Sequence, residues 1–146
     1  LYHDAVYVPG RSDNEARSAR LAVSEVQRWL PGDGLDVAWI ADLVELTARH
    51  GSFAPGDFSG EDADDTRHFL DCDMAILGAS PDAFDRYDAG IAEEYRKVVP
   101  KWIYRRKRRQ FLASLLDRER IFLSDFFHLR LEARARANLR RTLSLD

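Results

Sequence analysis

The sequence predicts an all-α protein. Along most of the chain, apolar residues recur at steps of three and four, the spacing that gives a helix one buried face. No segment shows the strict alternation of apolar and polar residues that is typical of a half-buried strand. Clusters of glycine and proline divide the chain into segments of helical length. We therefore expect a helical bundle of about six or seven helices.

Start and stop signals place the helices in the first part of the chain. The opening segment 1–8 is expected to be helical, with Asp4 on its inner face. Ser12 and Glu15 have the spacing of a capping box and open a helix that runs to about Leu30. A second helix follows over about 37–50, and Gly51 is a plausible cap at its C-terminal end.

Four further helices are predicted after the Gly- and Pro-rich loop 51–62. The first begins near Asp64 and ends at Gly78, and the next begins at Ser80 with Pro81 in its first turn. Pro100 separates it from a helix over about 101–116, and the last helix covers about 124–143. The inner face of the helix from Asp64 is expected to comprise Phe69, Cys72, Asp73, Ile76 and Leu77, with Asp71 pointing elsewhere.

Length and charge restrict the class of protein. A chain of 146 residues fits one domain (1–146), and 45% hydrophobic residues suffice for a single core. The net charge of -3 does not favour a nucleic-acid partner. The only cysteine, Cys72, excludes an intrachain disulfide and fits a reducing compartment, and no apolar stretch is long enough to span a membrane. We expect a soluble cytoplasmic protein with no membrane partner.

Three polar side chains lie where apolar ones are expected. Asp73 falls on the inner face of its helix, and His3 and Asp4 interrupt an apolar opening segment. A buried carboxylate must be paired, hydrogen-bonded or bound to metal, so a buried salt bridge or a helix-cap contact is an alternative for Asp73. Carboxylates with an imidazole and no thiolate suit a divalent ion such as Mn, Mg, Fe, Co or Ni, with Zn as a further option.

Four blocks in order resemble the HD superfamily of metal-dependent phosphohydrolases, and more closely a bacterial subfamily of small HD proteins. The superfamily pattern is a histidine, a His-Asp pair and a distant aspartate, and the pair matches His3 and Asp4 while the aspartate matches Asp73. The matching blocks are residues 2–7, residues 13–15 with Ser18 and Ala19, residues 69–78, and Glu132 with residues 136–139.

The resemblance implies an HD-domain-like bundle in which His3, Asp4 and Asp73 are metal ligands. The superfamily's first histidine belongs on a preceding helix, so the chain is expected to lack an N-terminal helix or helices. The resemblance also makes Glu15 and His50 candidates for orienting water or contacting phosphate. The capping box is an equal alternative for Glu15, and an interaction with the C-terminal helix dipole is an equal alternative for His50.

The implied activity is hydrolysis of a nucleotide or another small phosphomonoester. Arg108 lies at a family-like position within a basic run, residues 101–109, and is a candidate for binding the substrate. Such a run is more commonly a solvated helix face. Two other hypotheses are a catalytically silent nucleotide-sensing or scaffold domain and, ranked last, a DNA-associated helical protein.

Overall fold

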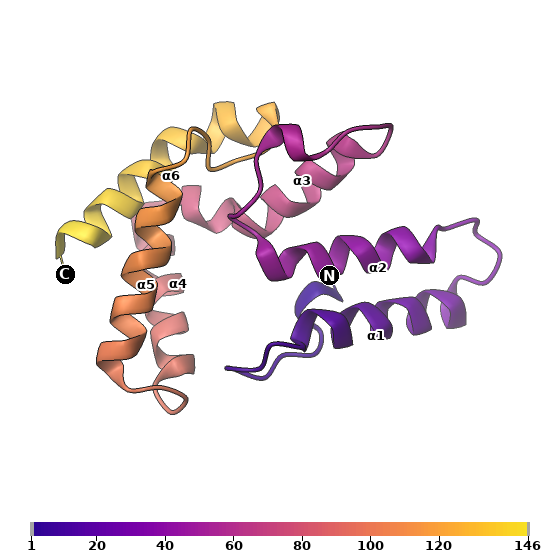
Figure 1. Cartoon of the computed structure of the whole chain (residues 1–146), viewed down its shortest axis with the longest axis horizontal. Coiled ribbons are helices and arrows are strands. Elements are labelled where there is room, and N and C mark those ends of the chain that lie inside the picture. Colours follow the sequence, from indigo (N-terminus) through magenta and orange to yellow (C-terminus); the bar gives the residue numbers. More distant parts are fainter. Residues whose placement is uncertain (1, 146) are drawn as a thin grey trace. The chain divides into compact units, whose positions relative to one another are not determined.

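The computed structural model describes residues 2–145, which form helices and connecting segments without a strand (Figure 1). The all-α prediction is therefore confirmed, with six α-helices and four short 3₁₀ turns in the described range. The chain divides into two compact units, a first that ends at His50 and a second that begins at Gly51. None of the helices in the described range combines the length and apolar character that a membrane span requires.

The first unit is built on a helical hairpin. Its elements are η1 (Tyr2–Asp4), α1 (Asn14–Trp29), α2 (Val37–Leu46) and η2 (Thr47–Arg49). Helices α1 and α2 lie side by side, and η1 packs against α1 (Figure 1). The buried face of α1 carries the small residues Ala19 and Ala22, which allow a close approach. Asp36 caps α2, because its carboxylate accepts the N–H groups of Ala38 and Trp39.

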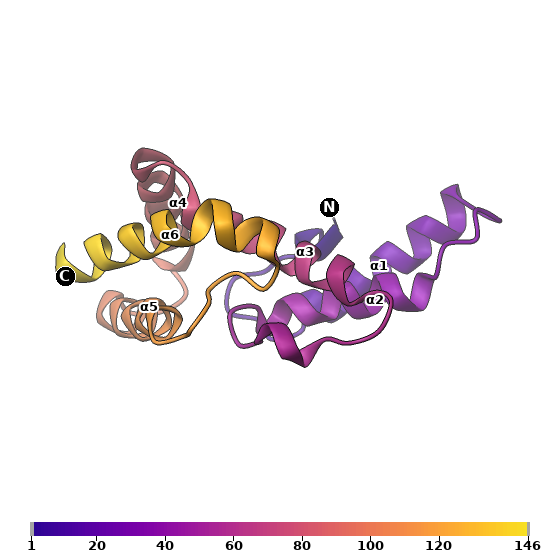
Figure 2. The same cartoon turned by 90° about the horizontal axis from the view of Figure 1, so that it is seen from above.

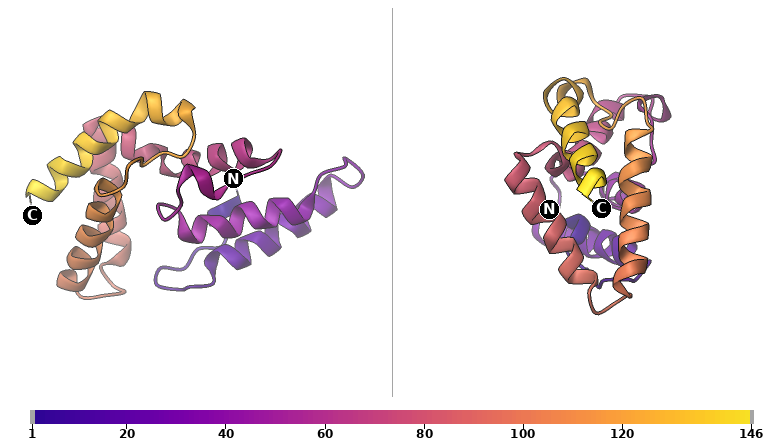
Figure 3. Two further views of the ribbon diagram at one scale, coloured as in Figure 1. Left: turned by 45° about the horizontal axis from the view of Figure 1, so that its top comes forward. Right: turned by 90° about the vertical axis from the view of Figure 1, so that its left-hand side faces the viewer.

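The second unit is organised around its last helix. Its elements are η3 (Pro55–Asp57), α3 (Ala63–Met74), η4 (Ala75–Gly78), α4 (Pro81–Tyr95), α5 (Lys101–Leu116) and α6 (Asp125–Leu145). Helix α6 packs on η4 and α5, and Figures 2 and 3 show it running between α4 and α5. The core comprises Met74, Leu77, Phe84, Leu112, Leu115, Ile121, Phe122, Ala135 and Leu139.

Two buried carboxylates hold the segment that connects α5 to α6. Asp71 of α3 is 1% exposed, and it accepts the N–H groups of Leu123 and Ser124 and the Ser124 hydroxyl at 2.6–2.8 Å. Glu132 accepts the N–H groups of Ile121 and Phe122 at 3.1–3.2 Å. The connecting segment thus buries its apolar side chains without leaving these backbone donors unsatisfied.

The turn η4 approaches α6 closely, and the contact depends on a glycine. Asn138 donates to the carbonyls of Leu77 and Ala79 at 2.9 and 3.0 Å, and Arg134 donates to the carbonyl of Gly78. A Cβ atom at Gly78 would lie 2.6 Å from the Cβ of Leu131. Glycine is therefore required here for space, because a side chain would force the two elements apart.

The predicted inner face of α3 is wrong except at Leu77, which is 2% exposed. Ala63, Thr66, Leu70 and Met74 are buried together with Asp71, whereas Cys72 is exposed and Asp73 and Phe69 are only partly buried. In the structure the burial of Asp71 is offset by its three donors from the 123–124 segment, and those donors cannot be read from the α3 sequence.

Two predictions for the N-terminal region are also wrong. The segment 1–8 contains only the short turn η1, and Asp4 is exposed rather than on an inner face; Leu1 lies outside the described residues. Helix α1 begins at Asn14, with Asp13 as N-cap and no side-chain cap, so Ser12 and Glu15 do not form a capping box. Asp13 is engaged instead by the guanidinium of Arg11, at 2.7 Å.

The other boundaries are confirmed to within a few residues. Pro81 occupies the first turn of α4, and α5 covers the predicted range 101–116. Gly51 has a φ of 75°, the left-handed conformation expected of a residue that ends a helical segment. On the last helix, Arg136 Nε lies 2.7 Å from Glu132 Oε1, an ion pair between residues four positions apart.

Replacing Asp71 should destabilise the second unit. In Asp71→Asn an amide N–H₂ group would face backbone donors, and we expect the free energy of unfolding to fall by about 2–4 kcal/mol. Urea denaturation measures the change. Asp65→Asn alters an exposed aspartate on the same helix and should stay within about 0.5 kcal/mol of the wild type. An equal effect of both variants would contradict the capping role of Asp71.

The contribution of Glu132 to the free energy of unfolding should depend on pH. Burial acts to raise the pKa of Glu132, but the N–H groups of Ile121 and Phe122 and the charge of Arg136 outweigh it and hold this pKa below its ordinary value. A lowered pKa in the folded state means that the ionised form stabilises the protein above the unfolded pKa, and that this stabilisation is lost as the pH falls through the folded pKa. The stability difference between wild type and Glu132→Gln should therefore be large at pH 7 and shrink toward about pH 3. A difference that is constant over this range in urea titrations would refute the assignment.

Two glycine substitutions should act in opposite directions. Gly78→Ala places a methyl group against the backbone and Cβ of Leu131 and should lower the free energy of unfolding by about 1–3 kcal/mol. Gly90→Ala lies within α4 with no atom near the added Cβ, and it should raise that free energy by about 0.5–1 kcal/mol. Thermal melts of the two variants provide the comparison, and stabilisation by Gly78→Ala would show that η4 and α6 are not in close contact.

Candidate functional site

The segment after the His3-Asp4 pair is fastened to α1 by two buried polar side chains. The N–H and carbonyl of Val6 both bond to the Ser18 hydroxyl, at 3.0 and 3.3 Å. The N–H and carbonyl of Val8 bond to the side-chain amide of Asn14, at 3.0 Å each. Asn14 and Ser18 are 3% and 0% exposed. They therefore satisfy the backbone of an irregular segment and hold it against the helix.

His3 and Asp4 point toward each other. The Nε2 atom of His3 lies 3.2 Å from the Oδ2 atom of Asp4, and their side chains are 21% and 61% exposed. An ion pair with a protonated imidazole accounts for this distance. Two ligands of a shared ion account for it equally, because atoms about 2.1 Å from an octahedral ion are separated by about 3 Å when they occupy adjacent positions.

Asp73 lies in the last turn of α3, in the second unit, and is partly buried. Its charge acts on Tyr87 of α4: burial raises the pKa of the Tyr87 hydroxyl, Arg108 opposes the shift, and Asp73 adds to it. The three predicted ligands are thus divided between the two units. Neither unit by itself holds, within the described range, a group of three or more His, Cys, Asp and Glu side chains that could bind an ion.

Glu15 and His50 both belong to the first unit. Glu15 is partly buried in the first turn of α1, immediately after Asn14, and the structural alternative of a capping box does not apply to it. His50 follows η2, and its backbone N–H donates to the carbonyl of Thr47 at 3.1 Å. Their proposed roles toward water or phosphate remain predictions.

Arg108 is held firmly in the second unit. Its Nε and Nη2 atoms lie 2.8 and 2.7 Å from Oδ1 of Asp88. The guanidinium also lies 5.7 Å from the ring centres of both Tyr87 and Phe111, which is within the range of a cation–π contact. With a side chain only 13% exposed, Arg108 is held by these contacts and is not a mobile surface cation.

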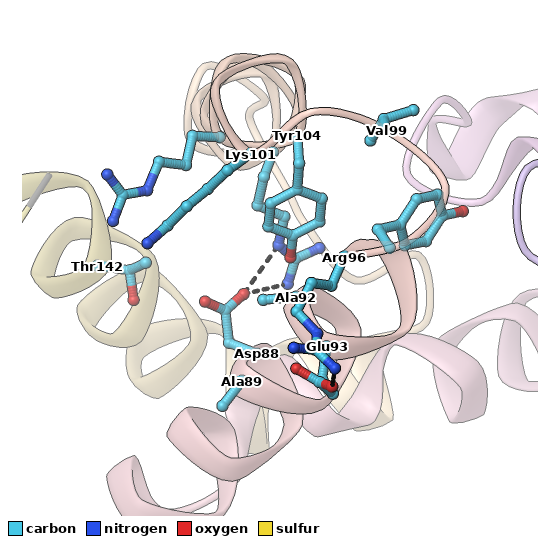
Figure 4. Close-up of a pocket in the computed structure, with 12 residues that line it drawn as sticks. Asp88, Ala89, Ala92, Glu93, Arg96, Val99, Lys101, Tyr104 and Thr142 are labelled. Carbon is cyan, nitrogen blue, oxygen red and sulfur yellow. Dashed lines mark hydrogen bonds and ion pairs between the residues drawn. The ribbon is translucent and has the colours of Figure 1, made fainter.

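Arg108 borders a cavity of about 410 Å³ in the second unit, drawn in Figure 4. Asp88 extends into it from α4, and Tyr104 and Lys101 extend from α5. The remaining lining residues are Ala89, Ala92, Glu93, Tyr95, Arg96, Val99, Arg105, Arg108 and Thr142. The sequence pattern indicated the basic run but not the cavity, because Asp88 and Tyr104 lie on different helices and are brought together only by packing.

The basic run 101–109 divides into two groups. Lys101, Arg105 and Arg108 line the cavity, whereas Arg106, Lys107 and Arg109 lie outside it. All of these basic residues except Arg108 are exposed, so the expectation of a solvated helix face describes most of the run.

A scan against protein-family models and searches of curated proteins and of solved structures found no match to the chain. Membership of the HD superfamily remains a prediction from the four sequence blocks.

Proposed function

We propose that the chain is a metal-dependent phosphohydrolase of the HD type, acting on a nucleotide or another small phosphomonoester. The observation that carries the proposal is the 3.2 Å separation of His3 Nε2 and Asp4 Oδ2. The two residues form the sequence pair that resembles the superfamily's ligand motif, and their distance suits adjacent positions around one divalent ion.

The donor set suits Mn, Mg, Fe, Co or Ni, with Zn as a further option, because it combines imidazole with carboxylates and lacks thiolate. In this proposal Asp73 supplies a further ligand. A bound ion would lower the pKa of a water ligand and polarise a phosphoryl oxygen.

The chain's own residues would prepare this site in two ways. Asn14 and Ser18 hold the backbone that follows Asp4, which restricts the positions that His3 and Asp4 can adopt. Glu15 or His50 would orient the attacking water or donate a proton to the leaving group.

Removing a proposed ligand should abolish both metal binding and turnover. In the full-length protein, Asp4→Asn and Asp73→Asn should each reduce phosphomonoester hydrolysis by at least about 100-fold and lower the bound metal. Mass spectrometry of the metal content and a phosphatase screen with Mn²⁺ measure the two effects. Asp65→Asn, an exposed aspartate on the helix of Asp73, is the matched control and should behave as the wild type.

Equal activity and metal content in the wild type and both ligand variants would exclude the proposal. Metal binding that depends on Asp4 and Asp73 without hydrolysis of any phosphomonoester would instead favour the catalytically silent sensing or scaffold domain.

A further inference from the structure

The cavity between α4 and α5 has the composition of a ligand site. We propose that it binds a small phosphate monoester, with the phosphate held by Lys101, Arg105 and the hydroxyl of Tyr104. All of its lining residues belong to the second unit. The inference does not rest on metal binding or on the proposed hydrolysis.

The charges around the cavity leave two cations available. Four basic side chains line it, and two of them are paired: Arg108 with Asp88 at 2.7 Å, and Arg96 with Glu93 at 2.9 Å. Lys101 and Arg105 have no carboxylate within ion-pair distance among the described residues. They are four residues apart on α5 and therefore lie on one helix face. An anion in the cavity would meet an unbalanced positive charge.

The hydroxyl of Tyr104 is a buried polar group without a hydrogen-bond partner in the described part of the chain. Burial raises the pKa of Tyr104, so at neutral pH the group carries its proton and can donate it to an acceptor. Figure 4 shows Tyr104 reaching into the cavity from α5, on the side opposite Asp88. A buried hydroxyl left unpaired is unfavourable, and a small rotation of the side chain that lets a ligand oxygen accept from it would remove that penalty.

The start of α5 favours an anion for a further reason. Pro100 is the N-cap residue and provides no side-chain cap, and the first turn of α5 contains no acidic residue. Lys101 therefore stands at the positive end of the helix dipole, where cations are normally disfavoured. A bound dianion would offset both the dipole and the cluster of cations.

The size and lining of the cavity indicate what carries the phosphate. About 410 Å³ is within the range of small-molecule sites. Ala89, Ala92, Val99 and the ring of Tyr95 contribute an apolar part of the wall. Two cations and a hydroxyl match the three terminal oxygens of a phosphate monoester better than the two oxygens of a carboxylate. Phenyl phosphate combines such a head with an apolar body and is a suitable probe.

Calorimetric titration in the presence of EDTA tests the proposal without any metal. Phenyl phosphate should bind more tightly than inorganic phosphate or benzoate, and phenol should not bind. Lys101→Gln and Arg105→Gln should each weaken phenyl phosphate binding by about tenfold. Lys107→Gln, an exposed cation outside the cavity on the same helix, is the control and should leave the affinity unchanged.

Tyr104→Phe separates a binding role from a structural one. It removes only the unpaired hydroxyl, so the melting temperature of the free protein should be unchanged or higher, while the affinity for phenyl phosphate should fall by about three- to tenfold. The inference is overturned by any of three results: no saturable binding of phenyl phosphate, equal binding of benzoate, or an equal loss of affinity in Lys107→Gln.

Discussion

The acceptance of backbone N–H groups by Asp71 and Glu132 is the constraint on which the second unit depends. The segment between α5 and α6 is irregular, yet Ile121 and Phe122 within it are 3% and 0% exposed and belong to the core. Apolar burial of an irregular segment is possible only if its backbone donors find partners. Two carboxylates on different helices supply these partners. The same residues can therefore pack their side chains in the core and keep their backbone N–H groups hydrogen-bonded.

The first unit uses the same principle with neutral side chains. Asn14 and Ser18 satisfy the backbone of residues 6 and 8, as Asn138 does for the carbonyls of η4 in the second unit. Asn14, Ser18 and Asn138 lie inside the sequence blocks that resemble the HD superfamily. Part of the resemblance therefore concerns residues that hold the fold, and the proposed chemistry rests on the smaller set His3, Asp4 and Asp73.

Helix α5 shows how packing gives one run of basic residues two different roles. Arg108 is neutralised by Asp88 and lies near two aromatic rings, so it stabilises the contact of α4 with α5. Lys101 and Arg105 occur earlier on the helix and border the cavity without such a partner in the part of the chain that the structure describes. The same residue type is structural where a carboxylate faces it, and it is available to a ligand where none does.

The sequence by itself determined that the chain is helical and where most of its helices begin and end, because periodicity, proline and glycine act over a few residues. Tertiary structure alone decided that Asp71 and not Asp73 is the buried carboxylate of α3, since its donors lie more than 50 residues away in the chain. It also decided that Asp88 of α4 and Tyr104 of α5 border one cavity. A local pattern states which residues can share a face, whereas the partner that makes burial of a polar group favourable comes from another element.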